Sequence, residues 1–362
     1  MTPPVSSLAA AAYRVPTDAP ESDGTFQWNA TTIVVARAAA GGSSGLGYSY
    51  TDASAAGLVG GMLAEAVVGR SAFDVEGAWE AMVGAVRNVG RSGISAMAIS
   101  AADAALWDLK GRLLGLPVAA LLGAVRPRVP VYGSGGFTSY SEAELAEQLA
   151  GWVESGIPRV KMKVGRRPED DPSRVAAARR AIGEEAELYV DANGAYERKP
   201  ALALAARFAE SGVSWFEEPV DARDIDGLRL VRDRAPASME IAVGEYGFVL
   251  SDFRRIIDAG AADVVQADAT RCAGITGFRK TVVLCREARL PLSSHCAPAL
   301  HVHPGCAAGP LRHLEYFHDH VRIESMLFDG PARPVDGSLA PDWSRPGLGI
   351  ELKTRDAERY AL

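Results

Sequence analysis

From Val129 onward, short apolar runs alternate with amphipathic segments along the chain. The apolar runs have the length and side-chain types of buried strands, and they occupy residues 129–133, 159–164, 187–190, 213–216, 241–243, 263–266, 290–293 and 313–317. Segments with helical periodicity lie between most of them, among them residues 142–153, 172–182, 201–210 and 274–289. Alternating strands and helices predict βαβ units and a parallel sheet. Eight such strands predict a closed (β/α) barrel, in which we expect the last helix to be replaced.

Residues 1–125 have the pattern of a small α+β domain. Two strands are predicted at 31–38 and 45–50, joined by the glycine- and serine-rich turn 41–44. Three helices are expected at about 55–68, 75–89 and 95–114. The segment 325–362 has little periodicity and many prolines and glycines, so we expect it to pack back on the first domain. The sequence thus predicts a first domain of residues 1–125, completed by 325–362, and a barrel of residues 126–324.

Composition narrows the class of protein. The chain has 362 residues and a net charge of −7, with no basic run, which argues against a nucleic-acid or membrane partner. Its four cysteines lack CxxC spacing, as is typical of reduced thiols rather than of disulfides or a zinc site. The apolar stretch Leu8–Ala12 is too short for a membrane span and has no basic region before it. We therefore expect a cytoplasmic enzyme, which we also expect to form a homo-oligomer.

Two lysines stand on one face of a predicted buried strand. They are Lys161 and Lys163, in a chain that has only six lysines among its 38 basic residues. A partly buried lysine can be tuned to act as a base near neutral pH, whereas arginine cannot. The alternative is that both side chains reach solvent along their aliphatic stems. This strand alone does not decide between the two.

Carboxylates follow three consecutive predicted strands of the barrel. Asp191, Glu217 and Glu245 come at or just after the strands that end near residues 190, 216 and 243. Any one of them is more often a turn former or a helix cap. Three at the same rim repel one another unless a cation lies among them, and Mg²⁺ prefers oxygen ligands. We expect a Mg²⁺ site formed by these three residues, with Glu218 pointing away from it.

The strand ends together resemble the enolase superfamily, and specifically its mandelate racemase subgroup. The motifs that carry the resemblance are Lys161-Met162-Lys163, Asp191-Ala192-Asn193, Glu217-Glu218-Pro219, Gly244-Glu245, Asp268, Ser293-Ser294-His295 and His313-Leu314-Glu315. The resemblance covers almost the whole chain. It implies an N-terminal α+β capping domain on a modified TIM barrel of (β/α)7β form.

The resemblance also implies roles for these residues. Asp191, Glu217 and Glu245 are expected to bind Mg²⁺, Lys163 to act as a base, and Asp268 and His295 to form a dyad on the opposite side. Further residues are implied to contact the substrate carboxylate or the groups beside it, namely Lys161, Asn193 and Glu315. We expect the cation and Lys161 to lower the pKa of Lys163, and a protonated Glu315 to donate a hydrogen bond.

Such a site removes the proton next to a carboxylate, and two outcomes follow. Expulsion of a β-hydroxyl dehydrates a sugar acid to a 2-keto-3-deoxy acid, which the resemblance favours. Return of the proton on the other face racemises or epimerises a 2-hydroxy acid. The branch of muconate cycloisomerases and dipeptide epimerases has a lysine at the end of the sixth strand. No lysine occurs in residues 264–274, which argues against that branch. A second departure is Tyr196, which stands where many members of the family have tryptophan. A non-catalytic metal-binding barrel and a Schiff-base aldolase are the rival classes.

The segment 16–28 precedes the first predicted strand and is expected to be a lid over the barrel. It holds three acids and no base. Free carboxylates suit sugar hydroxyls and repel a second carboxylate, which disfavours diacid substrates. An exposed polar turn is the alternative.

Overall fold

The barrel predicted from residue 129 onward is present in the computed structural model, which describes residues 2–362. Its parallel strands are β4 (Val129–Gly135), β5 (Arg159–Lys163), β6 (Glu187–Asp191), β7 (Val213–Glu217), β8 (Glu240–Val243), β9 (Val264–Ala267), β10 (Leu292–Ser294) and β11 (Leu314–Phe317). They pair in the order β10-β9-β8-β7-β6-β5-β4-β11. Strands β10 and β11 stand at the two ends of this order. Arg312 N, just before β11, donates to Leu292 O of β10 at 2.8 Å, so the barrel is nearly closed.

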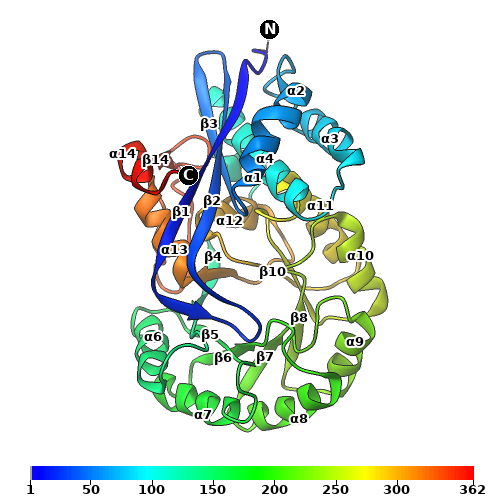
Figure 1. Cartoon of the computed structure of the whole chain (residues 1–362), viewed down its shortest axis with the longest axis vertical. Coiled ribbons are helices and arrows are strands. Elements are labelled where there is room, and N and C mark those ends of the chain that lie inside the picture. The colour runs from blue at the N-terminus through cyan, green and yellow to red at the C-terminus, as the bar shows by residue number, and fades with distance from the viewer. Residues whose placement is uncertain (1) are drawn as a thin grey trace.

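Helices follow the strands around the outside of the barrel (Figure 1). They are α6 (Glu142–Glu154), α7 (Asp171–Ile182), α8 (Arg198–Ala209), α9 (Ile225–Arg234), α10 (Leu250–Ala259), α11 (Gly274–Glu287), α12 (Pro298–Ala307) and α13 (His318–Leu327). The sequence predicted α6, α7, α8 and α11. The eighth strand is followed directly by α13, so a helix stands where we expected a replacement.

The N-terminal domain is an antiparallel sheet covered by helices. Its strands are β1 (Ser7–Ser22), β2 (Gln27–Ala40) and β3 (Ser43–Tyr50). Its helical segments are α1 (Ser54–Leu58), the π-helical turn η1 (Val59–Leu63), α2 (Ala64–Val67), α3 (Val75–Ala85), the 3₁₀ turn η2 (Val86–Asn88), α4 (Ile94–Leu114) and α5 (Val118–Leu121). The sequence did not predict β1, which begins at Ser7 and contains the apolar stretch Leu8–Ala12.

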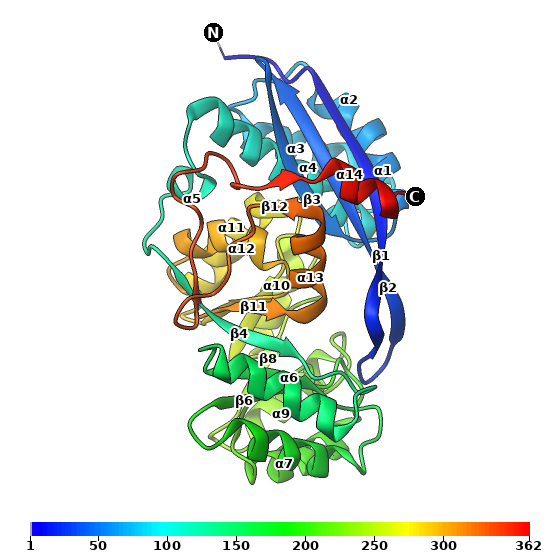
Figure 2. The ribbon, with the colours of Figure 1, turned by 90° about the vertical axis from the view of Figure 1, so that its left-hand side faces the viewer.

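The C-terminal segment contacts both the sheet and the barrel (Figure 2). It contains β12 (Phe328–Asp329), β13 (Ser338–Leu339), β14 (Glu351–Leu352), α14 (Thr354–Ala357) and the 3₁₀ turn η3 (Glu358–Tyr360). Strand β13 pairs with β4 of the barrel, and Leu362 N donates to Ala12 O of β1 at 3.0 Å. The buried carboxylate of Asp108 on α4 accepts from Leu46 N of β3 and from Leu348 N of this segment, both at 2.6 Å.

The hairpin of β1 and β2 reaches across the opening of the barrel (Figure 1). Its tip lies so close to the ends of β5 and β6 that a Cβ on Gly24 would be 2.7 Å from Val164 O and 2.6 Å from Ala192 O. Ser22 and Thr138 share a hydrogen bond of 2.7 Å between their hydroxyls. Segment 16–28 therefore lies over the barrel mouth, where a lid was expected, but it is the end of a β-hairpin and not a loop before the first strand.

Candidate active site

Three buried carboxylates meet at the mouth of the barrel. Asp191 ends β6, Glu217 ends β7 and Glu245 follows β8, and one oxygen of each lies within 4.8 Å of the others. The Oε2 atom of Glu245 is buried and has no hydrogen-bond partner among residues 2–362. Converging oxygens with one unsatisfied acceptor are the donor set that a hard divalent cation requires. The residues present therefore fit Mg²⁺.

The two lysines of β5 point into this group. Lys161 is fully buried, and its Nζ lies 2.5 Å from Glu217 Oε1, 2.9 Å from Glu315 Oε1 and 3.5 Å from Asp191 Oδ2. Lys163 Nζ contacts Asp191 Oδ2 at 2.5 Å. Lys161 is fully buried and Lys163 is only 6% exposed, so the alternative that both side chains reach solvent along their aliphatic stems is wrong.

Charge sets the protonation of these groups. Burial alone would raise the pKa of Asp191, but Lys163 and Lys161 lower it to about 2. Burial lowers the pKa of Lys163, yet the neighbouring Asp191 carboxylate outweighs it and leaves that pKa above its usual value. We expected the pKa of Lys163 to be lowered, which is the opposite direction. That expectation included the positive charge of a cation bound at Asp191. A cation bound there offsets the carboxylate that stabilises the ammonium form.

A histidine and an aspartate face the trio from the other side. His295 Nδ1 lies 2.8 Å from Asp268 Oδ2, and His295 Nε2 lies 3.5 Å from Glu245 Oε2. Asp268 also accepts from Thr270 N at 2.6 Å. Burial opposes ionisation of Asp268, but the hydrogen bond and charge of His295 lower the pKa of Asp268 below its usual range. The aspartate is thus an anion that orients the imidazole.

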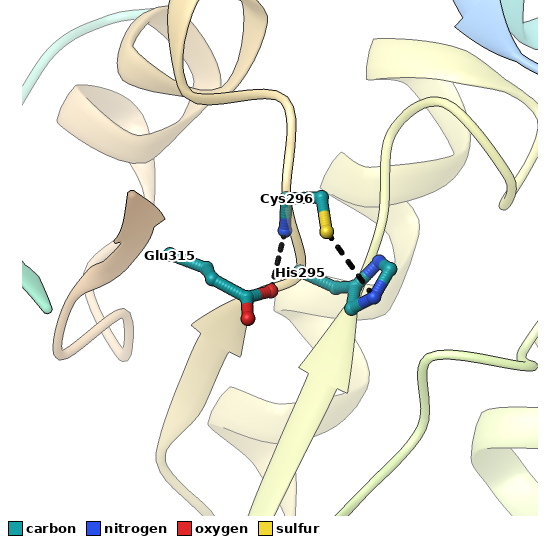
Figure 3. A group of neighbouring side chains, drawn as sticks. All are labelled: His295, Cys296 and Glu315. Atoms are coloured by element: carbon teal, nitrogen blue, oxygen red, sulfur yellow. Dashed lines mark hydrogen bonds between the residues drawn. The ribbon is translucent and has the colours of Figure 1, made fainter. Parts of the chain in front are cut away.

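Glu315 of β11 lies beside the segment after β10 that carries His295 and Cys296 (Figure 3). Its Oε2 accepts from Cys296 N at 2.7 Å and its Oε1 accepts from Ser134 Oγ at 2.6 Å. Burial raises the pKa of Glu315, but Lys161 and the other cations lower it well below its usual value. This direction is opposite to the expectation of a protonated Glu315, because the contact with Lys161 stabilises the carboxylate.

The loops after the strands hold unusual backbone conformations. Asn193 and Glu218 have φ of 46° and 37°, which is costly for residues with a Cβ and common at functional sites. Both line a cavity of about 580 Å³, which also touches Thr25 of the hairpin and Tyr246. The Asn193 Oδ1 atom is buried without a partner among residues 2–362, as expected of a side chain that awaits a ligand. Glu218 is not in the trio but is buried beside it.

Sequence reasoning missed several supporting residues. Arg271 NH1 lies 3.3 Å from Glu245 Oε1, Trp215 Nε1 donates to Glu217 Oε2 at 3.0 Å, and the Cys296 thiol lies 3.3 Å from His295 Nε2. His301 accepts from Ala269 N at 2.7 Å, next to Asp268. Arg271, Trp215 and Cys296 lie within three residues of a predicted site residue, and His301 follows His295 on the same segment. Nothing in the sequence indicates their contacts, which only the fold shows.

The three acids of the hairpin already have partners. Asp18 Oδ2 lies 2.9 Å from His318 Nε2, and Glu21 Oε2 accepts from Trp28 Nε1 at 2.7 Å. Asp23 Oδ1 accepts from Phe26 N at 2.6 Å and so shapes the tip. These engaged carboxylates therefore give no reason to disfavour diacid substrates. Among residues 2–362, no helix is long and apolar enough to cross a membrane.

Family models match both domains of the chain. The model described as "Mandelate racemase / muconate lactonizing enzyme, N-terminal domain" matches residues 13–123. The model described as "Enolase C-terminal domain-like" matches residues 144–357. Together they cover most of the sequence, and they fall on the capping sheet and on the barrel.

Individual relatives agree with these models. The L-talarate/galactarate dehydratase of Salmonella typhimurium is 34% identical over 326 residues, which cover 88% of this chain and 79% of that protein. Other relatives of similar identity carry the names of a cycloisomerase and of further sugar-acid dehydratases.

Two solved structures are similar over nearly the whole chain. A mandelate racemase/muconate lactonizing enzyme-like protein from Rubrobacter xylanophilus has a TM-score of 0.98 and 55% identity, and covers 99% of this chain and 100% of that one. A racemase from Streptomyces coelicolor with bound magnesium has a TM-score of 0.93 and 30% identity, with 99% and 100% covered. The chain is therefore an enzyme of the enolase superfamily and belongs to its mandelate racemase/muconate lactonizing enzyme family.

Proposed function

We propose that this enzyme uses Mg²⁺ to remove the proton next to the carboxylate of a sugar acid and then expels water to give a 2-keto-3-deoxy acid. One observation carries the proposal: Lys163 and His295 flank opposite ends of the acid trio. Lys163 contacts Asp191 at 2.5 Å, whereas His295 Nε2 lies 3.5 Å from Glu245. A carbon acid bound at the trio would have a proton carrier on each side.

Asp191, Glu217 and Glu245 would hold the Mg²⁺. When bound, the ion supplies Lewis-acid stabilisation of the negative charge that develops on the substrate carboxylate. Lys163 takes the α-proton, and Lys161 and Asn193 orient the carboxylate. His295, oriented by Asp268, carries the proton that leaves with the β-hydroxyl. The buried site, in which Lys163 and His295 are each 6% exposed, excludes water from these transfers.

Dehydration is favoured over racemisation by the relatives. Several of them, including the 34% identical Salmonella protein, are named as sugar-acid dehydratases. The same two proton carriers would also racemise a 2-hydroxy acid, and the Streptomyces structure at 30% identity is named a racemase. Racemisation of a 2-hydroxy acid is therefore the second candidate. Because the hairpin acids already have partners, the substrate panel includes diacids as well as monoacids.

The test is incubation of the enzyme with a library of acid sugars and Mg²⁺ in D₂O. Formation of a 2-keto-3-deoxy acid supports dehydration. Deuterium at the α-carbon without loss of water identifies a racemase or epimerase instead. Absence of both products and of exchange across mono- and diacids would contradict the proposal.

Variants assign the two proton carriers. Lys163→Ala and His295→Asn should each lower turnover by about 10²- to 10⁴-fold, the usual contribution of a positioned general acid or base. Both should still bind Mg²⁺, measured by calorimetry. Lys199→Ala, at an exposed lysine of α8, is the matched control and should keep full turnover. Turnover that is unchanged in both active-site variants would exclude the two-carrier scheme.

A further inference from the structure

A second group of metal-binding side chains lies outside the acid trio, where the hairpin meets the barrel. Asp18 and Glu21 come from β1, and His318 is the first residue of α13. One ligand atom of each lies within 4.8 Å of the others. In Figure 1 the lower part of β1 runs beside α13, and Arg322 of that helix donates to Pro16 O of the strand at 2.7 Å.

An irregularity in the hairpin brings the two acids to the same side. In a regular strand, residues three apart point to opposite faces. The pairing of β1 with β2 shifts between Pro16 and Glu21, which pair with Ala30 and Trp28. Four residues of β1 therefore oppose a single residue of β2, and such a bulge redirects side chains. It allows Asp18 and Glu21 to converge on His318.

Glu21 is the observation that points to a ligand. It is completely buried, with 0% of its surface exposed. Trp28 Nε1 donates to its Oε2 at 2.7 Å, but its Oε1 is buried with no partner among residues 2–362. A buried carboxylate with an unsatisfied oxygen is costly unless it is protonated or bound to a cation. Without a cation, burial and the neighbouring Asp319 raise the pKa of Glu21 to about 9.

The local charge is also unbalanced. The charged side chains that act most strongly on Glu21 are Asp319 and Asp18, which are acidic, and Arg322, which is basic. Arg322 NH2 is already bound to Asp319 Oδ1 at 2.6 Å. With Glu21 ionised and His318 neutral, these three carboxylates and one guanidinium carry a formal charge of −2, which one divalent ion would cancel.

We propose that Asp18, Glu21 and His318 form a second divalent-cation site, which fastens the β1–β2 hairpin to the start of α13. Two carboxylates and one imidazole suit Mn²⁺ or Zn²⁺. Because the hairpin covers the barrel and α13 follows the eighth strand, the ion would hold the lid over the active site. The site is separate from the acid trio and does not depend on the reaction that the trio supports.

The test counts Mn²⁺ ions bound per chain, from the free Mn²⁺ signal in electron paramagnetic resonance. The wild-type enzyme should bind two ions. Glu245→Gln, in the trio, should bind one, and the double variant Asp18→Asn/His318→Gln should also bind one. Combining all three changes should leave none. Glu169→Gln, at an exposed acid elsewhere on the surface, should still bind two.

A second readout follows the hairpin itself. In the Glu245→Gln enzyme, Mn²⁺ should raise the melting temperature and slow proteolysis of residues 16–28, since a ligand of the folded state stabilises it. Both effects should disappear when Asp18 and His318 are also replaced. One bound ion in the wild type, lost on Glu245→Gln, would overturn the second site and leave the trio intact. Two ions in the Asp18/His318 variant would overturn it as well.

Discussion

Lys161 is the cation that contacts three carboxylates of the active site at once. It is fully buried and contacts the carboxylates of Glu217, Glu315 and Asp191. Removing one partner from a buried ionic group leaves the others uncompensated, which typically costs about 3–5 kcal/mol. Lys161→Met should therefore lower the free energy of unfolding by about this amount in urea titrations without Mg²⁺. Lys199→Met, on the exposed face of α8, is the control and should change stability little.

Added Mg²⁺ distinguishes charge from packing in that experiment. A cation among the carboxylates replaces part of the lost positive charge, so Mg²⁺ should restore more stability to Lys161→Met than to the wild type. An equal gain in the two proteins, or a Lys161→Met enzyme as stable as the wild type, would contradict this account of Lys161.

The sequence predicted which residues gather at the mouth but not their protonation. Asp191, Glu217, Glu245, Lys163 and His295 were found because chemically active side chains follow successive strands. The pKa directions expected for Lys163 and Glu315 are opposite to those that the neighbouring Asp191 and Lys161 produce, because they depend on ångström-scale distances and on a cation bound at the trio. Ser134 and the Cys296 backbone N–H, which fix Glu315, carry no pattern in the sequence.

At the scale of elements, β3 and α4 pack so closely that glycine is required between them. A Cβ on Gly47 would lie 2.2 Å from Ala105 N and 2.3 Å from Ala101 O, both in the helix backbone. Gly47→Ala should therefore cost at least about 1–3 kcal/mol, as overpacking does. Gly84→Ala is the matched control, because Gly84 is exposed in α3 with no atom within 4 Å of an added Cβ. It should stabilise the protein by about 0.4–1 kcal/mol.

Thermal and urea unfolding of the two variants measure this contrast. Equal changes in stability would mean that β3 and α4 separate without cost, contrary to the observed packing.

The elements that the sequence missed have physical reasons in common. Strand β1 begins at Ser7 and contains a run of alanines, which have little intrinsic strand preference. Its pairing with the β-branched strand β2 decides its structure. Helix α12 is buried on nearly all sides and contains Pro304, so it shows no polar face. The barrel strands, by contrast, are buried on both faces and appear in the sequence as apolar runs.

At the scale of the whole molecule, Glu324 lies where the capping sheet, the barrel and α13 meet. Its Oε1 accepts from Tyr48 OH of β3 at 2.6 Å, and its Oε2 accepts from Ala299 N of α12 at 3.2 Å. Burial outweighs these hydrogen bonds and raises the pKa of Glu324 to about 8 in the folded protein. In the unfolded chain a glutamate titrates near about 4.3.

Because the pKa of Glu324 differs between the folded and unfolded states, the free energy of unfolding depends on pH through this residue. Between the two pKa values the folded state binds more protons than the unfolded state, so stability falls as the pH rises, by at most about 1.4 kcal/mol per unit. The contribution of Glu324 is complete below about pH 4.3 and is lost as the pH passes about 8. Glu324→Gln imitates the protonated side chain and removes this titration. Wild type and variant should have similar unfolding free energies near about pH 4, below the pKa of the unfolded chain, in urea titrations.

At pH 9 the variant should be more stable than the wild type by up to about 5 kcal/mol, the linkage of a pKa that moves from about 4.3 in the unfolded chain to about 8 in the folded protein. Glu287→Gln, at an exposed position at the end of α11, should follow the wild type at both pH values. Parallel pH profiles of the wild type and Glu324→Gln would mean that Glu324 is ionised throughout. In that case a buried carboxylate would hold the junction at every pH. Alkaline solution would then not weaken the contact between the capping domain and the barrel.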